Sequence, residues 1–274
     1  VEYMPLIMFA TVFVFLLLGY PVAFTIGGVS MFFGLLNFGP SFFNLLPLRI
    51  WGTMTNFTLL AVPLFIYMGV MLEKSGLAEE LLDTMALVFA RLRGGLAVSI
   101  VFVGALMGAS TGIVGATVVT MGLLSVPTLL KNRYSKSLTT GTVAASGTLG
   151  QIIPPSIVLV LLGDIMSVPV GDLFIGAIIP GLILVCLYML YILIVAHIKK
   201  DWAPLIPKEE LSHVSGKYLL MKVGKALIPP LALMIAVLGS IFAGIASPTE
   251  AASVGAIGAT LLTVLHGRFT MKIL

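Results

Sequence analysis

Long uncharged segments separated by short charged ones run along most of this chain. Residues 4–36 contain no charged side chain, and Gly19-Tyr20-Pro21 divides them into two halves. Because proline lacks a backbone donor and about 20 apolar residues span a bilayer core, we expect two membrane spans joined by a tight turn there, or one long kinked helix. Residues 37–49 are expected to form a loop with a short interfacial helix. Further spans are predicted over residues 55–72, 173–198, 226–245 and 251–266.

Residues 73–93 have a different pattern, in which apolar and charged positions alternate at helical spacing. Leu77, Leu81 and Met85 recur on one face of such a helix, and Glu79 and Asp83 recur on another. An amphipathic helix of this kind is typical of the membrane interface. We therefore expect this segment to lie in the interface.

The stretch 94–130 is uncharged throughout but basic at both ends. Its basic flanks are Arg91, Arg93, Lys131, Arg133 and Lys136. Positive residues beside membrane segments mark the cytoplasmic side, so the stretch is expected to enter and leave the bilayer by the same face. Its first arm, 96–107, would reach roughly 18 Å into a hydrocarbon core about 30 Å thick. We predict a re-entrant hairpin with the small residues 108–112 at its tip; two complete short spans are the alternative.

The segment 137–166 is predicted to be a transmembrane helix that is broken at membrane depth. Residues 147–156 within it contain two glycines and the consecutive prolines Pro154 and Pro155. Each proline removes a backbone donor and pushes the preceding residue out of the helical conformation. Inside a bilayer, the freed backbone groups need protein groups, water or an ion as partners.

The basic clusters between the apolar segments set the expected topology. Lys199 and Lys200 open a polar and basic stretch, 199–225, which we expect to be a cytoplasmic linker with an interfacial helix. The positive-inside rule then places the N-terminus outside and residue 274 inside. Ser247 and Glu250 have the spacing of an N-cap and its capping-box partner, so a capping role is expected for Glu250, with ion coupling as the alternative.

Composition indicates a polytopic all-α membrane protein and narrows its chemistry. Hydrophobic residues make up 59% of the 274 and charged residues 9%, and the net charge of +4 comes from the loops, which gives no reason to expect nucleic acid. The single cysteine, Cys186, suits packing in an apolar helix. The histidines lack metal-site spacing, Asp164 and Asp172 lie at the ends of a loop, and Ser110 and Ser146 have no neighbouring base. Neither a transition-metal site nor an intramembrane enzyme is therefore expected.

The hairpin tip and the helix break are the places where binding chemistry is expected. Where two such discontinuities face each other, carbonyls and hydroxyls form a shell of hard oxygen ligands, for which sodium is the natural guest. Half-helix N-termini at the same place carry partial positive charge and favour an anionic substrate. The alternative for each glycine is that it only permits close helix packing.

Four segments, in order, resemble motifs of one transporter family. Residues 104–117 resemble the first re-entrant hairpin of the large membrane subunit of tripartite ATP-independent periplasmic (TRAP) transporters, the DctM-like family. Residues 144–156 resemble the family's broken helix, and residues 19–24 and 247–252 resemble two further signatures. Family members are longer, so the resemblance implies that this chain is the N-terminal portion and holds the first of two inverted repeats.

The resemblance implies an elevator-type fold of the ion transporter superfamily kind and a sodium-coupled importer of an organic acid, such as a carboxylate or 2-oxo acid. It implies a small TRAP membrane subunit and a periplasmic substrate-binding protein as partners, in the bacterial inner membrane with a periplasmic N-terminus. The hairpin sequence is closer to the branch associated with mannitol, chloroaromatic or 2-oxo acid uptake than to the sialic-acid branch. A membrane scaffold that binds partner subunits without carrying solute is the alternative function. The expected parts are scaffold and arm helices 1–93, transport-domain elements 94–198, the linker 199–225 and scaffold helices 226–274.

The same resemblance suggests which residues bind the ion and the substrate. Sodium is expected at seven residues of the two breaks: Ser110, Thr111, Gly112, Ser146, Gly147, Thr148 and Gly150. The substrate is expected at Ser110, Thr111, Pro155 and Ser156. No cofactor besides sodium ions is expected, and the second repeat would supply the remaining residues of the site.

Overall fold

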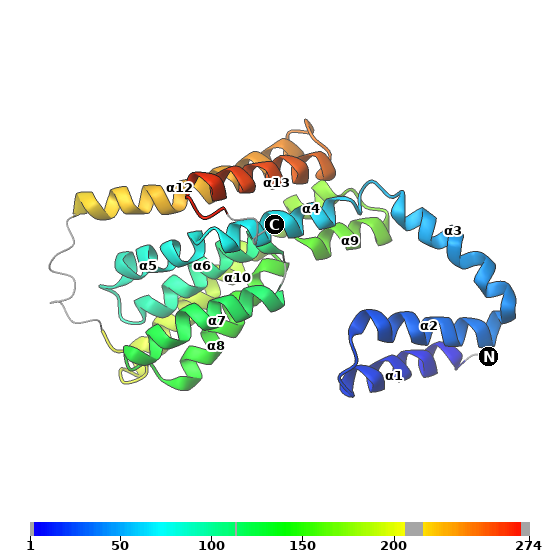
Figure 1. Cartoon of the computed structure of the whole chain (residues 1–274). Coiled ribbons are helices and arrows are strands. Elements are labelled where there is room, and N and C mark those ends of the chain that lie inside the picture. The colour runs from blue at the N-terminus through cyan, green and yellow to red at the C-terminus, as the bar shows by residue number, and fades with distance from the viewer. Residues whose placement is uncertain (1–2, 113, 206–215, 270–274) are drawn as a thin grey trace. The chain divides into compact units, whose positions relative to one another are not determined.

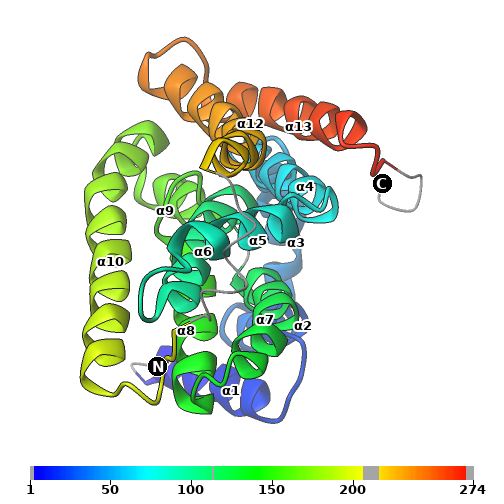
Figure 2. The ribbon, with the colours of Figure 1, turned by 90° about the vertical axis from the view of Figure 1, so that its left-hand side faces the viewer.

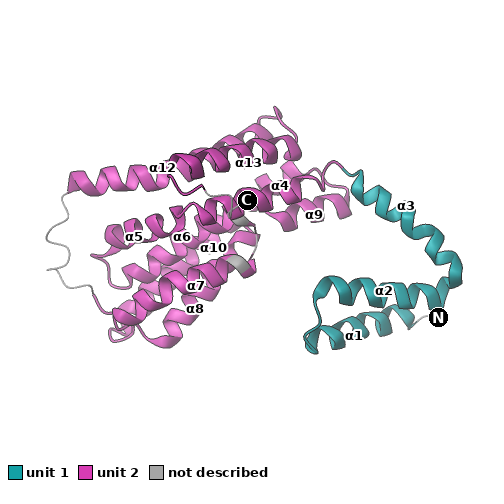
Figure 3. Cartoon of the chain, in the orientation of Figure 1, with its two compact units in different colours: residues 1–56 teal, residues 57–274 magenta. Residues whose placement is uncertain are grey.

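The computed structural model describes residues 3–112, 114–205 and 216–269, and the regular structure in these ranges is helical. The chain divides into two compact units, residues 1–56 and 57–274 (Figure 3).

The first unit is a helical pair followed by a third helix. It contains α1 (Met4–Leu17), α2 (Val22–Phe38), a short 3-10 turn (Gly39–Ser41) and α3 (Phe42–Met54). The chain turns at Gly19, whose φ of +87° is a left-handed conformation that glycine adopts without strain. Because α1 packs against α2, the tight turn is confirmed and the single kinked helix is wrong. The expected short helix after residue 37 is longer than predicted and continues to Met54.

The second unit is a bundle of nine α-helices and one 3-10 turn among its described residues (Figures 1 and 2). In chain order these are α4 (Ala61–Lys74), α5 (Leu77–Phe89), α6 (Gly95–Thr111), α7 (Val114–Lys131), α8 (Lys136–Thr148), the turn η2 (Leu149–Gln151), α9 (Ile157–Met166), α10 (Val170–Ile198), α12 (Gly216–Phe242) and α13 (Pro248–Leu265).

Helix α6 is at the centre of this unit. It contacts α4, α5, α7, α8, α10 and η2, and Ala97, Val101 and Val103 along it are fully buried. Its surroundings explain why a helix without an amphipathic pattern is stable here: a helix that is apolar all round must be covered on every side. Helix α6, the first arm of the hairpin, therefore shares one packed core with the second arm and the broken helix.

A second hydrophobic cluster joins α4 and α13, with contributions from α9, α10 and α12. Phe65 of α4 and Phe174 of α10 meet edge to face, with ring centroids 6.5 Å apart. Thr263 of α13 donates a hydrogen bond to the Met71 carbonyl of α4 at 3.2 Å, although the residues lie far apart in sequence. Helices α4 and α13 thus pack as a pair.

Four helical segments of the described chain are long and apolar enough to cross a membrane. They are Val22–Met54, Val170–Ile198, Gly216–Phe242 and Pro248–Leu265; α4 and α5, bent by 60° at their junction, would make a fifth. Helices α1, α6, α7 and α9 belong to the shorter apolar class. The lengths of α6 and α7 are compatible with a re-entrant hairpin, which stays a prediction.

Several predicted boundaries shift in the structure. Helix α4 begins at Ala61 instead of residue 55, because residues 57–60 form turns. Helix α12 runs unbroken from Gly216 through Pro229 and Pro230, so the predicted change from linker to scaffold at 225 falls inside one helix; residues 206–215 of that linker lie outside the described residues. Helix α10 begins at Val170 instead of residue 173.

Helix α13 confirms the capping prediction. The Ser247 hydroxyl accepts a hydrogen bond from the Glu250 backbone N–H at 3.3 Å, and the Glu250 carboxylate accepts one from the Ser247 N–H at 2.7 Å. This reciprocal pair satisfies two backbone donors that a helix start otherwise leaves open. The structure therefore gives Glu250 a structural function at the helix terminus.

Candidate functional site

The small-residue run predicted as the hairpin tip is mostly helical. Helix α6 continues to Thr111, four residues beyond the predicted end of the first arm, and the turn itself begins at Gly112. Gly112 has a φ of +61°, and its N–H donates to the Gly108 carbonyl at 2.9 Å, which closes the helix. The N–H groups of residues 108–111 take part in helical hydrogen bonding, so these small residues do not need to leave the helix.

The predicted helix break is present, beginning two residues later than expected. Helix α8 ends at Thr148, η2 follows, and α9 starts at Ile157; the Pro154-Pro155 peptide bond is cis. Ser156 is the N-cap of α9: its hydroxyl accepts from the Leu159 N–H at 3.4 Å and donates to the Gln151 carbonyl at 2.7 Å. A single buried hydroxyl thus links the two sides of the break.

The hairpin and the break contact each other through their backbones. A Cβ built on Gly150 would lie 2.5 Å from the Gly108 Cα, and one built on Gly112 would lie 3.1 Å from the Ile157 side chain. Gln151 spans the same gap, donating a hydrogen bond from Nε2 to the Gly112 carbonyl at 3.1 Å. Two segments that are about 40 residues apart in sequence therefore meet where both are irregular.

Further glycines extend this close approach along the two helices. Gly104 of α6 lies against Ser146 of α8, where an added Cβ would be 2.7 Å from the Ser146 Cβ. Gly147 lies against the backbone of Val118 in α7, with 2.8 Å between an added Cβ and the Val118 Cα. The packing function of these glycines is thus visible in the contacts. Their sodium-binding function stays a prediction.

The predicted site residues differ in how the structure places them. Ser110, Gly112, Ser146, Gly147, Gly150, Pro155 and Ser156 are buried, whereas Thr148 is exposed. Thr111 is described through its backbone, as the last residue of α6. The Ser110, Ser146 and Thr148 hydroxyls donate to the carbonyls of Met107, Val143 and Ala145, at 2.7, 3.0 and 2.8 Å. These bonds use the hydroxyl hydrogens and leave oxygen lone pairs for another partner.

Gln151 was not among the predicted site residues, yet it joins the two breaks directly. Its amide side chain is half-buried and can donate and accept at the same time. Its position beside the prolines was the available signal.

The helix ends at this place carry partial charges of both signs. The C-terminal ends of α6 and of α8 with η2 carry partial negative charge from their last carbonyl groups, while the N-termini of α7 and α9 carry partial positive charge. Carbonyl ends favour a cation and helix N-termini favour an anion. One small region could therefore bind a cation and a carboxylate side by side.

The opposite, open end of the hairpin is held together by loop contacts. The Ser135 N–H donates to the Trp202 carbonyl at 2.9 Å, and a Cβ on Gly94 would lie 2.8 Å from the Ala196 Cβ of α10. Tyr134, in the loop between α7 and α8, is 4% exposed; burial raises its pKa to about 12, although a hydrogen bond with the Leu96 backbone opposes this shift. The start of α6, the end of α7 and the end of α10 therefore meet at this end.

These features define a class: a polytopic α-helical membrane protein in which a helical hairpin packs against a broken helix. Residues 9–274 match the family described as "Tripartite ATP-independent periplasmic transporter, DctM component". The chain belongs to this family, which is a family of transporter permeases and not of enzymes.

Curated relatives agree with this assignment. The chain is 36% identical over 230 residues to the C4-dicarboxylate TRAP transporter large permease protein DctM of Pseudomonas aeruginosa, covering 84% of this chain and 52% of the relative. It is 33% identical over 251 residues to the Vibrio cholerae protein of the same name, and the match covers 92% of this chain and 54% of that relative. The ectoine TRAP transporter large permease protein TeaC of Halomonas elongata is 30% identical over 260 residues, and the match covers 94% of this chain and 59% of that relative. The chain thus spans about half the length of the curated relatives it matches.

Proposed function

We propose that this chain is part of the large permease subunit of a sodium-coupled importer of organic acids. In this proposal the hairpin, the broken helix and α10 belong to a mobile transport domain that moves as an elevator against a static scaffold. A periplasmic substrate-binding protein delivers the substrate, and a small membrane subunit completes the scaffold in the inner membrane. Family membership supports this function, and the second half of the permease would complete the site.

The observation that carries the proposal is the meeting of the hairpin turn and the helix break. Gly108 and Gly150 bring the two backbones into contact, and Gln151 fixes the turn at Gly112. Carbonyl ends and hydroxyl oxygens are the neutral, hard ligands that sodium prefers, and few other arrangements expose backbone oxygens at membrane depth. Sodium bound here would neutralise the carbonyl ends and tie the two breaks together.

The proposed substrate is an organic acid whose carboxylate lies at the helix N-termini of this region. Helix α9 begins at Ser156, and α7 begins at Val114 just after the turn. Backbone N–H groups at such ends bind anions without a basic side chain. The relatives are named for C4-dicarboxylates and ectoine, both of which carry carboxylate groups, and these names support the class of substrate.

The alternative function is a membrane scaffold that binds partner subunits and carries no solute. It accounts for the large exposed apolar side chains of α1, α2 and α3, which suit lipid or another membrane subunit. It does not account for two irregular segments whose backbones meet in the core of the second unit. We therefore prefer the transport function.

Sodium-dependent uptake by the full-length protein with its partner subunits in proteoliposomes tests the proposal. We expect Ser110→Ala combined with Ser156→Ala to abolish uptake driven by a sodium gradient, because two buried oxygens at the two breaks are lost. Ser240→Ala is the matched control, since Ser240 makes the same kind of bond to a carbonyl three residues earlier, in α12. Unchanged uptake with unchanged sodium dependence in the double variant would refute the site.

A further inference from the structure

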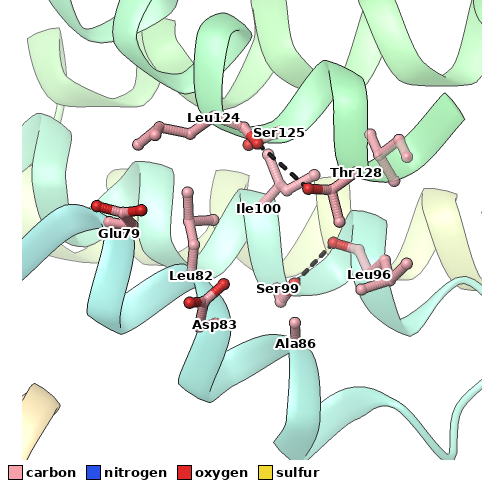
Figure 4. Close-up of a pocket in the computed structure, with 11 residues that line it drawn as sticks. Glu79, Leu82, Asp83, Ala86, Leu96, Ser99, Ile100, Leu124, Ser125 and Thr128 are labelled. Carbon is pink, nitrogen blue, oxygen red and sulfur yellow. Dashed lines mark hydrogen bonds between the residues drawn. The ribbon is translucent and has the colours of Figure 1, made fainter. Parts of the chain in front are cut away.

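A separate pocket lies at the open end of the hairpin, between α5 and the two hairpin helices (Figure 4). Its volume is about 160 Å³, and its polar lining consists of Glu79 and Asp83 from α5, Ser99 from α6, and Ser125 and Thr128 from α7. Ser99 precedes Ser110 by eleven residues of α6, or roughly 16 Å of helix, so the pocket is distinct from the breaks.

The two carboxylates that line this pocket belong to exposed residues. Glu79 and Asp83 are four residues apart, which places them on the same face of α5 as neighbours. Among the residues that the structure describes, neither carboxylate makes an ion pair or side-chain hydrogen bond. Like charges in this arrangement repel each other, so a cation between them would stabilise both.

Hydroxyl oxygens form the opposite wall. Ser99 and Ser125 are 1% and 3% exposed, and Thr128 lies one turn beyond Ser125. The Ser99 hydroxyl donates to the Leu96 carbonyl at 2.7 Å, and the Thr128 hydroxyl donates to the Leu124 carbonyl at 3.4 Å (Figure 4). Both bonds leave oxygen lone pairs available to a ligand.

Ser125 is the observation that points to a ligand. Its buried hydroxyl has no hydrogen-bond partner within the described part of the chain, and Ser125 is one of the residues that line the pocket. A helical serine commonly satisfies its hydroxyl on a carbonyl of the preceding turn, as Ser99 does. A buried hydroxyl without a partner is unfavourable, and an ion or its bound water would satisfy it.

We propose that this pocket is a binding site for a hard metal cation, held by the Glu79 and Asp83 carboxylates and the Ser99, Ser125 and Thr128 hydroxyls. All five side chains offer oxygen, the ligand type that Na⁺, Mg²⁺ and Ca²⁺ share. The volume of about 160 Å³ corresponds to roughly five waters at about 30 Å³ each, enough for a cation that keeps part of its hydration shell. The site is independent of the proposed sodium site at the helix breaks.

Basic side chains nearby provide the competing explanation for the acidic face of α5. A second pocket, of about 340 Å³, is lined by Glu79, Glu80 and Asp83 together with Lys222, His266 and Arg268. If the acidic face only balances the charge of these basic residues, substitution of any of the three carboxylates should change the response to cations equally. Glu80 lines the second pocket and not the first, so it separates the two explanations.

Cation-dependent thermal unfolding of the full-length protein in detergent tests the site. The unfolding midpoint is measured with NaCl, MgCl₂ or CaCl₂ against choline chloride at equal ionic strength. We expect at least one of these cations to raise the midpoint specifically. Glu79→Gln and Asp83→Asn should each weaken binding. The cation concentration that gives half of the maximal rise in the unfolding midpoint should increase by about tenfold or more, because affinity follows the number of charged ligands.

Hydroxyl and charge controls make the outcome decisive. Ser125→Ala should weaken the same cation effect and Ser125→Thr should retain it, whereas Glu80→Gln should leave it unchanged. No cation-specific stabilisation would overturn the proposal, as would equal losses in Glu79→Gln and Glu80→Gln. A sodium effect that disappears in Ser110→Ala with Ser156→Ala but persists in Asp83→Asn belongs to the helix breaks, and it would overturn a sodium site here while leaving the proposed function intact.

Discussion

Replacing Gly150 by alanine should separate the broken helix from the hairpin. The new Cβ would lie 2.5 Å from the Gly108 Cα and 2.6 Å from its carbonyl carbon and oxygen, whereas ordinary contacts begin at 3.4 Å. The deficit is 3.4 − 2.5 = 0.9 Å, and it is met by backbone, which cannot rotate away. Overpacking of this kind costs about 1–3 kcal/mol, so we expect the unfolding midpoint to fall by roughly 2–10 °C.

The assay combines thermal unfolding of the purified full-length protein with sodium-driven uptake in proteoliposomes. Gly115→Ala is the matched control, because Gly115 is helical, lies near the same turn and has nothing within 4 Å of an added Cβ. Gly255→Ala should be intermediate, since its nearest neighbour is the flexible Met68 side chain at 2.6 Å. If Gly150→Ala matches Gly115→Ala in both stability and uptake, the close contact between the two breaks is not a feature of the native protein.

Three other substitutions have distinct expected effects. Gln151→Leu removes the hydrogen bond to the Gly112 carbonyl and should raise the sodium concentration that gives half-maximal uptake. Gln151→Glu should have the same effect, because its carboxylate offers no amide donor. Wild-type sodium dependence in both variants would contradict this prediction. Ser247→Ala removes the cap of α13 and should lower stability by about 1 kcal/mol in thermal unfolding, whereas Ser247→Asp should restore it. The pKa of Tyr134 rises from 10.0 to about 12 on folding, so the folded state holds the proton more tightly and the stability of the protein should fall as the pH rises from 10 towards 12. In a pH series of unfolding midpoints, the midpoint of Tyr134→Phe should fall less over this range than that of the wild type. Parallel curves for the two proteins would refute the assignment.

The positions of the breaks were predictable from the sequence because they depend on local backbone chemistry. Pro154 and Pro155 cannot continue a helix in any environment, and Ser247 followed by Glu250 specifies a helix start through its own hydrogen bonds. Gly19-Tyr20-Pro21 likewise specifies a turn. These features come out as expected, apart from shifts of a few residues at their boundaries.

The parts that sequence reasoning missed depend on distant contacts. The end of α6 was placed too early because small residues suggested a loop, but close packing against Gly150 requires small residues in a helix just as well. The charges at residues 217–225 suggested a linker, yet the helix continues through them to Phe242. Gln151 bonds to a residue 39 positions away, which no local pattern indicates.

The contacts at the open end of the hairpin have a consequence for the proposed movement of the transport domain. Because the Ser135 N–H is hydrogen-bonded to the Trp202 carbonyl and Gly94 packs on Ala196, the base of the hairpin is attached to the end of α10. In the proposed elevator movement we therefore expect α6, α7, α8 and α10 to be displaced together. The 60° bend between α4 and α5 lies outside these contacts, so in the proposed elevator movement we expect a crosslink that fixes this bend to block uptake without altering either break.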